Sequence, residues 1–219
     1  MIDRGAPLYV GAVTPAQCRF ATKRWHYAGR MPAATHCFGV WESGRFVGVV
    51  LFGPGAAPNI ASPFGLRPTE VRELLRVALR DHVAPVSQIL AVTVRMLRKR
   101  SPDLRLLVSF ADTEQGHHGG IYQAAGWTYI GTGSNDTRYR VNGVLVHPRT
   151  LGSAYGVGGQ SVRWLREHVD PKAEIVKLGP KHKYALALDP QTRVQIEAKR
   201  QRPPRGEGDG VSRRSTLTG

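Results

Sequence analysis

The fold of this chain is decided by the stretch VRELLRVALRDHVAPVSQILAVTVRMLRKRSPDLRLLVSFAD, residues 71–112. Residues 71–79 have an apolar run of strand length, and residues 104–110 are apolar over the length of a strand buried in a sheet. Between them, Ser87 to Arg100 carries apolar residues at helical spacing and ends in three basic residues. The pattern predicts strand, loop, helix and strand, with Ser87 as the N-cap of the helix.

Asp112 stands at the carboxyl end of the second strand, and the loop 113–120 that follows contains His117 and His118. Ligands of open α/β sheets bind outside the carboxyl ends of strands, so this loop is the first place to expect chemistry. The next segment, IYQAAGW (residues 121–127), predicts a short helix that stops at Gly126.

This order of elements, with IYQAAGW near its end, resembles the acyl-coenzyme A N-acetyltransferase (GNAT) superfamily over about residues 8–140. The resemblance implies an α/β fold with a mixed, mostly antiparallel central sheet flanked by helices. One loop departs from the family pattern. Residues 80–88, where the coenzyme A pyrophosphate would bind, contain no glycine, and Pro85 lacks an N–H for phosphate. The sequence therefore does not support ordinary coenzyme A binding.

Several short motifs resemble, in the same order, the Mom family of phage DNA-modification proteins. They are WHYAGR (25–30), FGVWE (38–42), VGVVLFGP (47–54), ELLR (73–76), SFAD (109–112), GGIYQA (119–124) and HPRT (147–150). The resemblance implies a transferase that adds a carbamoylmethyl (acetamido-type) group to the N6 amino group of adenine in DNA. It also implies protection of phage DNA from host restriction.

The charge of the chain favours a polyanionic partner. Its 219 residues include 31 Lys and Arg against 16 Asp and Glu, a net charge of +15. Neutralising phosphates releases counterions and gives affinity without sequence reading, so we expect double-stranded DNA as the partner. A basic ribosome-associated protein would have the same composition, and this alternative stays open.

Cys18 and Cys37 are the only cysteines, and the amino terminus has no signal-peptide pattern. No stretch is apolar over the roughly 20 residues that a membrane span needs. We therefore expect a protein of the reducing host cytoplasm with no membrane partner. A homodimer stays open.

We expect a GNAT-like catalytic domain over residues 1–150, an extension packed on it over 151–190, and a disordered basic tail over 191–219. Thr14-Pro15 predicts the start of a helix that runs to Arg24. Hairpins are predicted around residues 42–44 and 142–143, a turn at 131–136, and separate short strands at 174–178 and 185–188.

Adenine N6 is a poor nucleophile because its lone pair is delocalised into the ring, so a transferase must remove a proton or use an activated donor. His26, at a junction of helix and loop, and Asp112 are the candidates for moving that proton. Tyr122 lies where GNAT enzymes often carry the tyrosine that protonates a leaving group. Each residue has a structural alternative: His26 and Asp112 could be caps, and Tyr122 could pack its helix on the sheet.

His26, Asp112 and His118 are also candidate ligands of a metal, and the resemblance suggests Fe(II). No tight spacing such as H-x-D specifies such a site. Adjacent side chains in a loop diverge, so at most one of His117 and His118 would share a metal with Asp112.

Arg76 and Ser87 are candidates for binding a small-molecule donor, because a guanidinium and a hydroxyl at a helix start can hold a carboxylate-like group. Arg76 could instead pair with Glu70 or Glu73. Candidate contacts to nucleic acid are Tyr27, Arg30, Arg149, Lys181 and Lys183. The lysines could equally protect an exposed strand edge.

The sequence thus predicts a Mom-type adenine-modifying enzyme. Two other functions stay open: an acetyl-coenzyme A-dependent N-acetyltransferase of the GNAT superfamily, and a noncatalytic module that binds nucleic acid.

Overall fold

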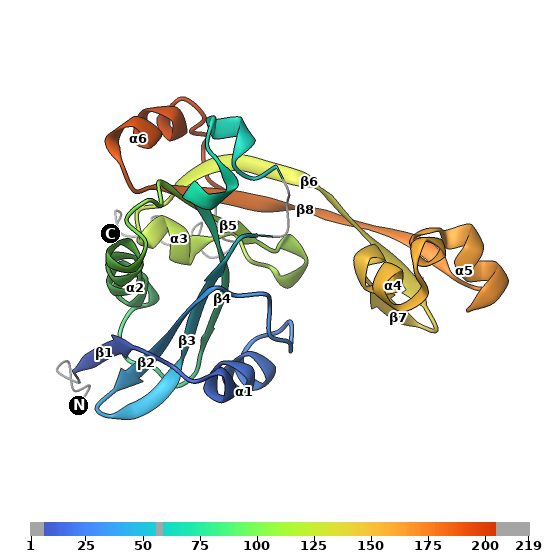
Figure 1. Cartoon of the computed structure of the whole chain (residues 1–219), viewed down its shortest axis with the longest axis horizontal. Coiled ribbons are helices and arrows are strands. Elements are labelled where there is room, and N and C mark those ends of the chain that lie inside the picture. Colours follow the sequence, from blue (N-terminus) through green and yellow to red (C-terminus); the bar gives the residue numbers. More distant parts are fainter. Residues whose placement is uncertain (1–6, 56–58, 205–219) are drawn as a thin grey trace, which may run out of the picture. The chain divides into compact units, whose positions relative to one another are not determined.

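The computed structural model describes residues 7–55 and 59–204. In this part of the chain the strands form one sheet in the order β1-β2-β3-β4-β5-β8-β6-β7 (Figure 1). The strands are β1 (Leu8–Gly11), β2 (His36–Glu42), β3 (Arg45–Gly53), β4 (Val71–Leu79), β5 (Leu106–Ala111), β6 (Thr128–Val141), β7 (Val144–Val146) and β8 (Glu174–Ala187). Strands β1 to β4 pair antiparallel, whereas β4 and β5 are parallel. The predicted α/β fold with a mixed, mostly antiparallel sheet is confirmed.

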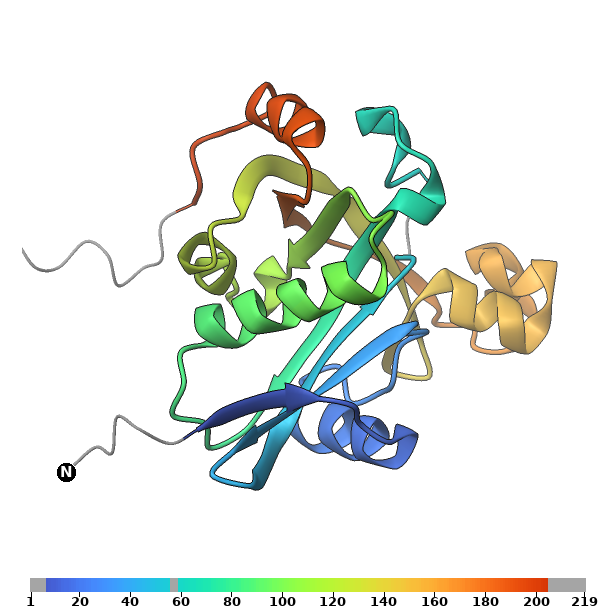
Figure 2. The ribbon, with the colours of Figure 1, turned by 60° about the vertical axis from the view of Figure 1, so that its left-hand side comes forward.

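Helices cover both faces of this sheet (Figure 2). The helices are α1 (Pro15–Trp25), α2 (Val86–Arg100), α3 (Gly120–Ala124), α4 (Pro148–Tyr155), α5 (Val162–His168) and α6 (Pro190–Glu197), with short 3-10 turns η1 (Ser62–Phe64), η2 (Pro68–Glu70), η3 (Thr113–Gln115) and η4 (Val157–Gln160). Helix α1 packs on Val49 and Leu51 of β3, and α2 packs on Val50 and Phe52. Successive strand residues point to opposite faces, so α1 and α2 lie on opposite sides of the sheet.

Capping explains where the two helices begin. Thr14 caps α1 in a capping box with Gln17, as the Thr14-Pro15 pair predicts. The predicted cap of α2 is wrong. The helix begins at Val86, with Pro85 at the cap position, and the Pro85 carbonyl accepts from the N–H groups of Gln88 and Ile89. Ser87 therefore lies within the first turn.

Two predicted hairpins are confirmed. Ser43 and Gly44 turn the chain between β2 and β3 with φ of 49° and 76°, and Asn142 and Gly143 turn it between β6 and β7 with φ of 50° and 76°. Two successive residues with positive φ give the turn that matches the twist of paired strands. Within β3, a Cβ at Gly48 would lie 2.0 Å from the Ala78 carbonyl oxygen, so the two backbones approach too closely for a side chain.

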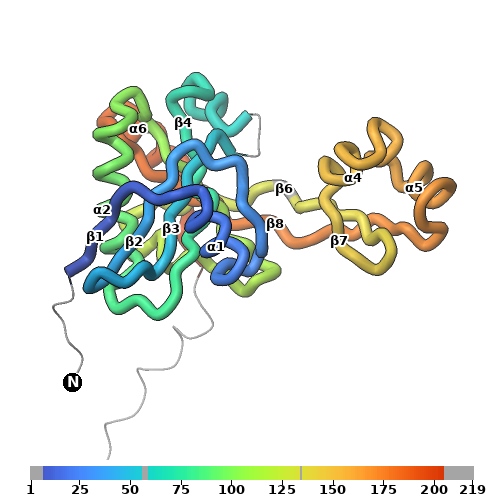
Figure 3. The backbone as a smooth tube through the Cα atoms, turned by 60° about the horizontal axis from the view of Figure 1, so that its bottom comes forward, coloured from blue at the N-terminus to red at the C-terminus, as the bar shows by residue number. Residues whose placement is uncertain are grey.

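The predicted turn at residues 131–136 is wrong, because β6 continues through it to Val141. The two short strands predicted at 174–178 and 185–188 are also wrong as separate elements, because residues 174–178 and 185–187 belong to the single strand β8. Strands β6 and β8 are neighbours in the sheet (Figure 3). Strand β6 continues through Gly131, whose φ is +101°, and β8 continues through Pro180. Glycine and proline usually interrupt strands, so the local sequence predicts breaks at both positions. Pairing between segments far apart in the sequence keeps both residues within strands.

The contacts divide the described chain into two units. Unit 1 comprises Met1–Ala111, His118–Gly131 and Lys183–Gly219, and unit 2 comprises Asp112–His117 and Thr132–His182, as far as these ranges are described. Unit 2 has a small core of its own, formed by Tyr139, Val141, Leu151, Leu165 and Ala173. The domain boundaries expected at residues 150 and 190 stay a prediction. None of the helices within residues 7–55 and 59–204 is long and apolar enough to cross a membrane.

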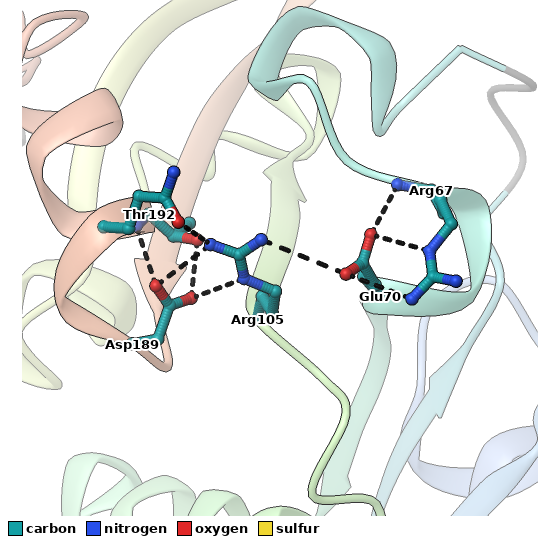
Figure 4. A network of polar contacts seen from close by, with 6 residues as sticks. Arg67, Glu70, Arg105, Asp189 and Thr192 are labelled. Carbon is teal, nitrogen blue, oxygen red and sulfur yellow. Dashed lines mark hydrogen bonds and ion pairs between the residues drawn. The ribbon is translucent and has the colours of Figure 1, made fainter.

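Helix α6 lies where a disordered basic tail is expected from the sequence. Its Ile196 is only 1% exposed and belongs to a buried cluster with Leu106, Val108 and Ala185. Arg105, just before β5, holds the Asp189 carboxylate that caps the helix (Figure 4). These contacts fold residues 190–197, and the part of the predicted tail from residue 205 onward lies outside the described residues.

Candidate functional site

A bulge in β4 places Glu73 and Arg76 on one face of the sheet. Glu73 is opposite Gly53 and Arg76 is opposite Leu51, with a register shift between them. In a regular strand, residues three apart point to opposite faces. Here their partners Leu51 and Gly53 are two residues apart on β3 and so point to the same face. The bulge, which adds one residue to β4, therefore turns Glu73 and Arg76 to that same face. Both charged side chains therefore lie on the face where Leu51 packs with α1.

Strands β4 and β5 pair over a short length only. Their register runs from the Val71–Leu106 pair to the Glu73–Val108 pair, although β4 continues to Leu79. Immediately past this point the fully buried Ser109 donates its hydroxyl to the Leu74 carbonyl at 3.2 Å. The site is thus built where the backbone pairing of two central strands ends.

Tyr122 of α3 joins this site through a hydrogen bond with Ser109. It is 9% exposed, and its ring lies 5.6 Å from Trp127 and 5.2 Å from Tyr184 between centroids. Burial is the main cause that raises the pKa of Tyr122, and the nearby Tyr27 and Glu73 raise it further. The phenol is therefore protonated at neutral pH and can donate a proton, while its ring also packs α3 on the sheet.

Arg76 is a half-buried cation, and one of its N–H groups has no hydrogen-bond acceptor. Its Nη1 donates to the Leu75 carbonyl at 2.6 Å, and its buried Nε has no hydrogen-bond partner. Burial lowers its pKa, while Tyr27 and Glu73 oppose that shift. A guanidinium remains charged under these conditions, so Arg76 can offer an N–H to an oxygen of a bound ligand. Glu73 is close enough to counteract this lowering of the pKa.

The end of α1 brings further predicted residues near this cluster. Tyr27 and Arg30 both influence the pKa of Arg76, and Tyr27 is 54% exposed. The His26 ring stacks on Tyr27 with centroids 4.4 Å apart. Its Nδ1 accepts from the Ala28 N–H at 3.1 Å, so a neutral His26 carries its proton on Nε2. That tautomer leaves an N–H donor on the other side of the ring.

Asp112 belongs to unit 2, whereas His26 belongs to unit 1. The Asp112 carboxylate caps η3 by accepting from the Glu114 N–H at 3.2 Å, which is the structural role considered for it from the sequence. Its Oδ2 is also 3.7 Å from Nζ of Lys181, which lies 3.4 Å from Asp136. Lys181 thus has acidic neighbours within its own unit, and its predicted contact with nucleic acid stays a prediction, as does the pairing of Asp112 with His26.

The histidine loop is divided between the units, with His117 in unit 2 and His118 in unit 1. The His118 carbonyl accepts from the Tyr184 hydroxyl at 2.6 Å, which fixes the backbone before α3. Across residues 7–55 and 59–204 no group of three or more His, Cys, Asp or Glu side chains has the arrangement of a metal site. The Fe(II) site predicted at His26, Asp112 and His118 therefore stays a prediction, and no chemical step is derived through it.

The remaining predicted residues lie away from this cluster along the chain. Ser87 is half-buried in the first turn of α2. Arg149 is exposed at the start of α4, where its N–H donates to His147 Nδ1. Lys183 lies 5.7 Å from the centroid of the Phe64 ring, and burial followed by the nearby charge of Lys199 lowers its pKa.

Sequence reasoning did not assign Ser109 or Glu73 to the site. Ser109 lies inside the apolar run of β5, and its signal is a single hydroxyl in a strand whose other side chains are apolar. Glu73 follows the alternation of β4, and only the bulge, which no local pattern reveals, brings it to the side of Arg76.

Comparison with known proteins agrees with the Mom resemblance. The chain is 28% identical over 180 residues to the methylcarbamoylase mom of Escherichia phage Mu, covering 80% of this chain and 73% of that protein. Among solved structures, a Bacillus subtilis acetyltransferase in complex with CoA is similar over 84% of this chain and 100% of its own, with 10% identity and a TM-score of 0.41. The AHL synthase LasI is similar over 92% of this chain and 100% of its own, with 11% identity and a TM-score of 0.43.

These TM-scores are too low to carry an argument about the fold, so the fold is described from the strand order alone. The family model of the Mom proteins matches residues 7–205, which is nearly the whole length of the sequence. This chain belongs to the Mom protein family.

Proposed function

We propose that the protein is a transferase that adds a carbamoylmethyl group to adenine N6 in phage DNA and so protects that DNA from host restriction. The name of the relative from phage Mu, a methylcarbamoylase, supports the type of group transferred. The observation that carries the proposal is the half-buried Arg76, whose buried Nε has no partner and whose pKa is influenced by Tyr122. A buried N–H group without an acceptor is costly unless a ligand supplies one.

The reaction that we propose forms a bond between adenine N6 and the methylene carbon of an activated carbamoylmethyl donor. The leaving group departs with the electron pair of the bond that breaks. The N6 proton passes to the Asp112 carboxylate, and Tyr122 gives its proton to the leaving group. His26, whose Nδ1 already accepts from the Ala28 N–H, orients the base through its Nε2–H. Arg76 holds an oxygen of the donor through its Nε–H.

The net charge of +15 supports double-stranded DNA as the substrate, with Tyr27, Arg30, Arg149, Lys181 and Lys183 as proposed contacts. A base inside a duplex must leave the stack to be modified, and the exposed ring of Tyr27 beside His26 offers a surface for it. Fe(II) binding and action in the host cytoplasm belong to the same proposal.

The test is to express the protein in a bacterium, digest the DNA to nucleosides, and search by mass spectrometry for deoxyadenosine carrying one carbamoylmethyl group. We expect the modified nucleoside with the wild type and its loss with Arg76→Met. Arg72→Met is the matched control, since Arg72 lies on the same strand and also has a buried Nε without a partner, but its Nη1 donates to three backbone carbonyls. Asp112→Ala tests the proposed proton acceptor.

An unmodified deoxyadenosine pool with folded wild-type protein would count against the proposal and in favour of a module that only binds nucleic acid. Equal modification by wild type and Arg76→Met would remove Arg76 from the site. Acetylation of a small amine from acetyl-coenzyme A, without any change in DNA, would support the GNAT alternative instead.

A further inference from the structure

The loop between β4 and α2 holds an acidic side chain of the protein itself. The backbone N–H of Val83 donates to Oε2 of Glu42 at 2.7 Å, and the N–H of Ala84 donates to Oε1 of the same residue at 2.8 Å. Two successive N–H groups thus bind one carboxylate, with one bond to each oxygen. Glu42 stands at the end of β2 and is only 4% exposed, whereas Val83 is 57% exposed, so the contact is partly buried.

The geometry of the loop is that of an anion-binding site. Successive N–H groups that point to one side bind anions in proteins, and the first turn of a helix adds the positive end of its dipole. Here both features coincide, because Val83 and Ala84 immediately precede the 15-residue helix α2. The Glu42 carboxylate occupies the position that a phosphate would take in such a loop.

Other contacts fix the loop in this conformation. Asp81 has a positive φ of 51°, and its carbonyl accepts from the Arg45 guanidinium. The Arg80 side chain pairs with Asp81 at 3.1 Å, and the His82 ring lies 2.9 Å from the Ala84 carbonyl oxygen. The N–H groups of Val83 and Ala84 are therefore held in place, and the anion that they bind is the carboxylate of Glu42.

We infer that Glu42 is a specificity-determining residue: it fills the anion position before α2 and excludes ligands whose diphosphate would bind there. The inference concerns the donor side of the protein and holds whichever base is modified. It gives a physical reason, beyond the lack of glycine, why a nucleotide-linked donor such as a coenzyme A thioester would not be held by this loop.

The test follows the amide resonances of Val83 and Ala84 by NMR while inorganic pyrophosphate, and separately coenzyme A, is added. In the wild type we expect these two resonances not to move. In Glu42→Ala and Glu42→Gln we expect a saturable shift at both, with affinity at least about tenfold higher than in the wild type. Glu174→Gln is the control, because it also removes one negative charge, but from a half-exposed ion pair with Arg140 in unit 2.

Glu42→Gln keeps the size of the side chain, so it decides the matter if Glu42→Ala does not fold. A saturable shift of Val83 and Ala84 in the wild type would overturn the inference, and so would folded Glu42→Gln protein that binds pyrophosphate no better than Glu174→Gln. If neither variant folds, the wild-type titration decides by the same criterion. These outcomes do not depend on DNA modification, so they are distinct from a failure of the proposed function.

Discussion

Arg105 holds Asp189 through two parallel hydrogen bonds, from Nε to Oδ2 at 3.2 Å and from Nη2 to Oδ1 at 3.3 Å (Figure 4). The same guanidinium lies 3.9 Å from Glu70, which itself binds Arg67. Asp189 caps α6 and accepts from the N–H and hydroxyl of Thr192. This network attaches the last helix to the chain segment before β5.

The Arg105–Asp189 pair predicts a loss of stability at low pH. Burial opposes ionisation of Asp189, but hydrogen bonds from Arg105 and Thr192 outweigh it and lower the pKa from 3.8 to about 2. A lowered pKa in the folded state stabilises the protein above the unfolded pKa, and this contribution is lost as the pH falls from about 4 toward 2. We expect Asp189→Asn to lower the free energy of unfolding by about 1–3 kcal/mol at pH 7.

Urea denaturation at several pH values checks this prediction. The difference between wild type and Asp189→Asn should shrink below pH 4, whereas Asp103→Asn, at an exposed position, should differ little from wild type at any pH. A difference that does not change with pH would show that the charge of Asp189 is not what stabilises α6.

Helix α6 itself predicts a contrast between two of its side chains. Ile196 is 1% exposed and Val194 is 70% exposed, only two residues apart. Ile196→Ala should lower the free energy of unfolding by about 2–5 kcal/mol, because it leaves a cavity among Leu106, Val108 and Ala185. Val194→Ala should change it by no more than about 0.5 kcal/mol. Equal, small effects in urea denaturation would return residues 191–197 to the disordered tail expected from the sequence.

These results show which parts of the fold the sequence can reveal. The strand β4, the helix α2 and the strand β5 could be predicted, because their periodicity is local and their ends carry breakers or charges. The length of β6 and β8 could not, because partners far apart in sequence keep Gly131 and Pro180 inside strands. Arg76 is a candidate by its residue type and Tyr122 by the GNAT resemblance, but the bulge that sets Glu73 on the same face as Arg76 is a property of strand pairing.

His36 predicts a second dependence on pH. Its Nε2 lies 2.9 Å from the Ser101 hydroxyl, and burial, followed by the charges of Arg72 and Arg100, lowers its pKa below 6.5. The unfolded chain then binds more protons than the folded one near pH 6, so stability is present above pH 6.5 and falls as the pH drops below it. We expect His36→Gln to flatten the decline in melting temperature between pH 7.5 and 5.5. If the melting temperature declines with the same slope in wild type and variant, a group other than His36 causes the decline.

Tyr122 gives the sharpest prediction about catalysis. If its phenol protonates the leaving group, Tyr122→Phe should reduce the formation of modified deoxyadenosine by at least about 100-fold, while the protein stays folded. Tyr139→Phe is the matched control, because Tyr139 is also 9% exposed and its hydroxyl donates to the Gln160 carbonyl at 2.7 Å within unit 2. That variant should lose stability but keep its activity per folded molecule.

The dependence of rate on pH separates an acid from a packing residue at position 122. Because burial raises the pKa of Tyr122, the phenol stays protonated past the pH at which an ordinary tyrosine ionises, so the wild-type rate should not fall near pH 10 through loss of this proton. Tyr122→Phe should reduce the rate at every pH without moving the remaining pH profile. If Tyr122→Phe and Tyr139→Phe lower activity only in proportion to the folded fraction, the hydroxyl of Tyr122 serves packing and its hydrogen bond with Ser109, and another group must supply the proton.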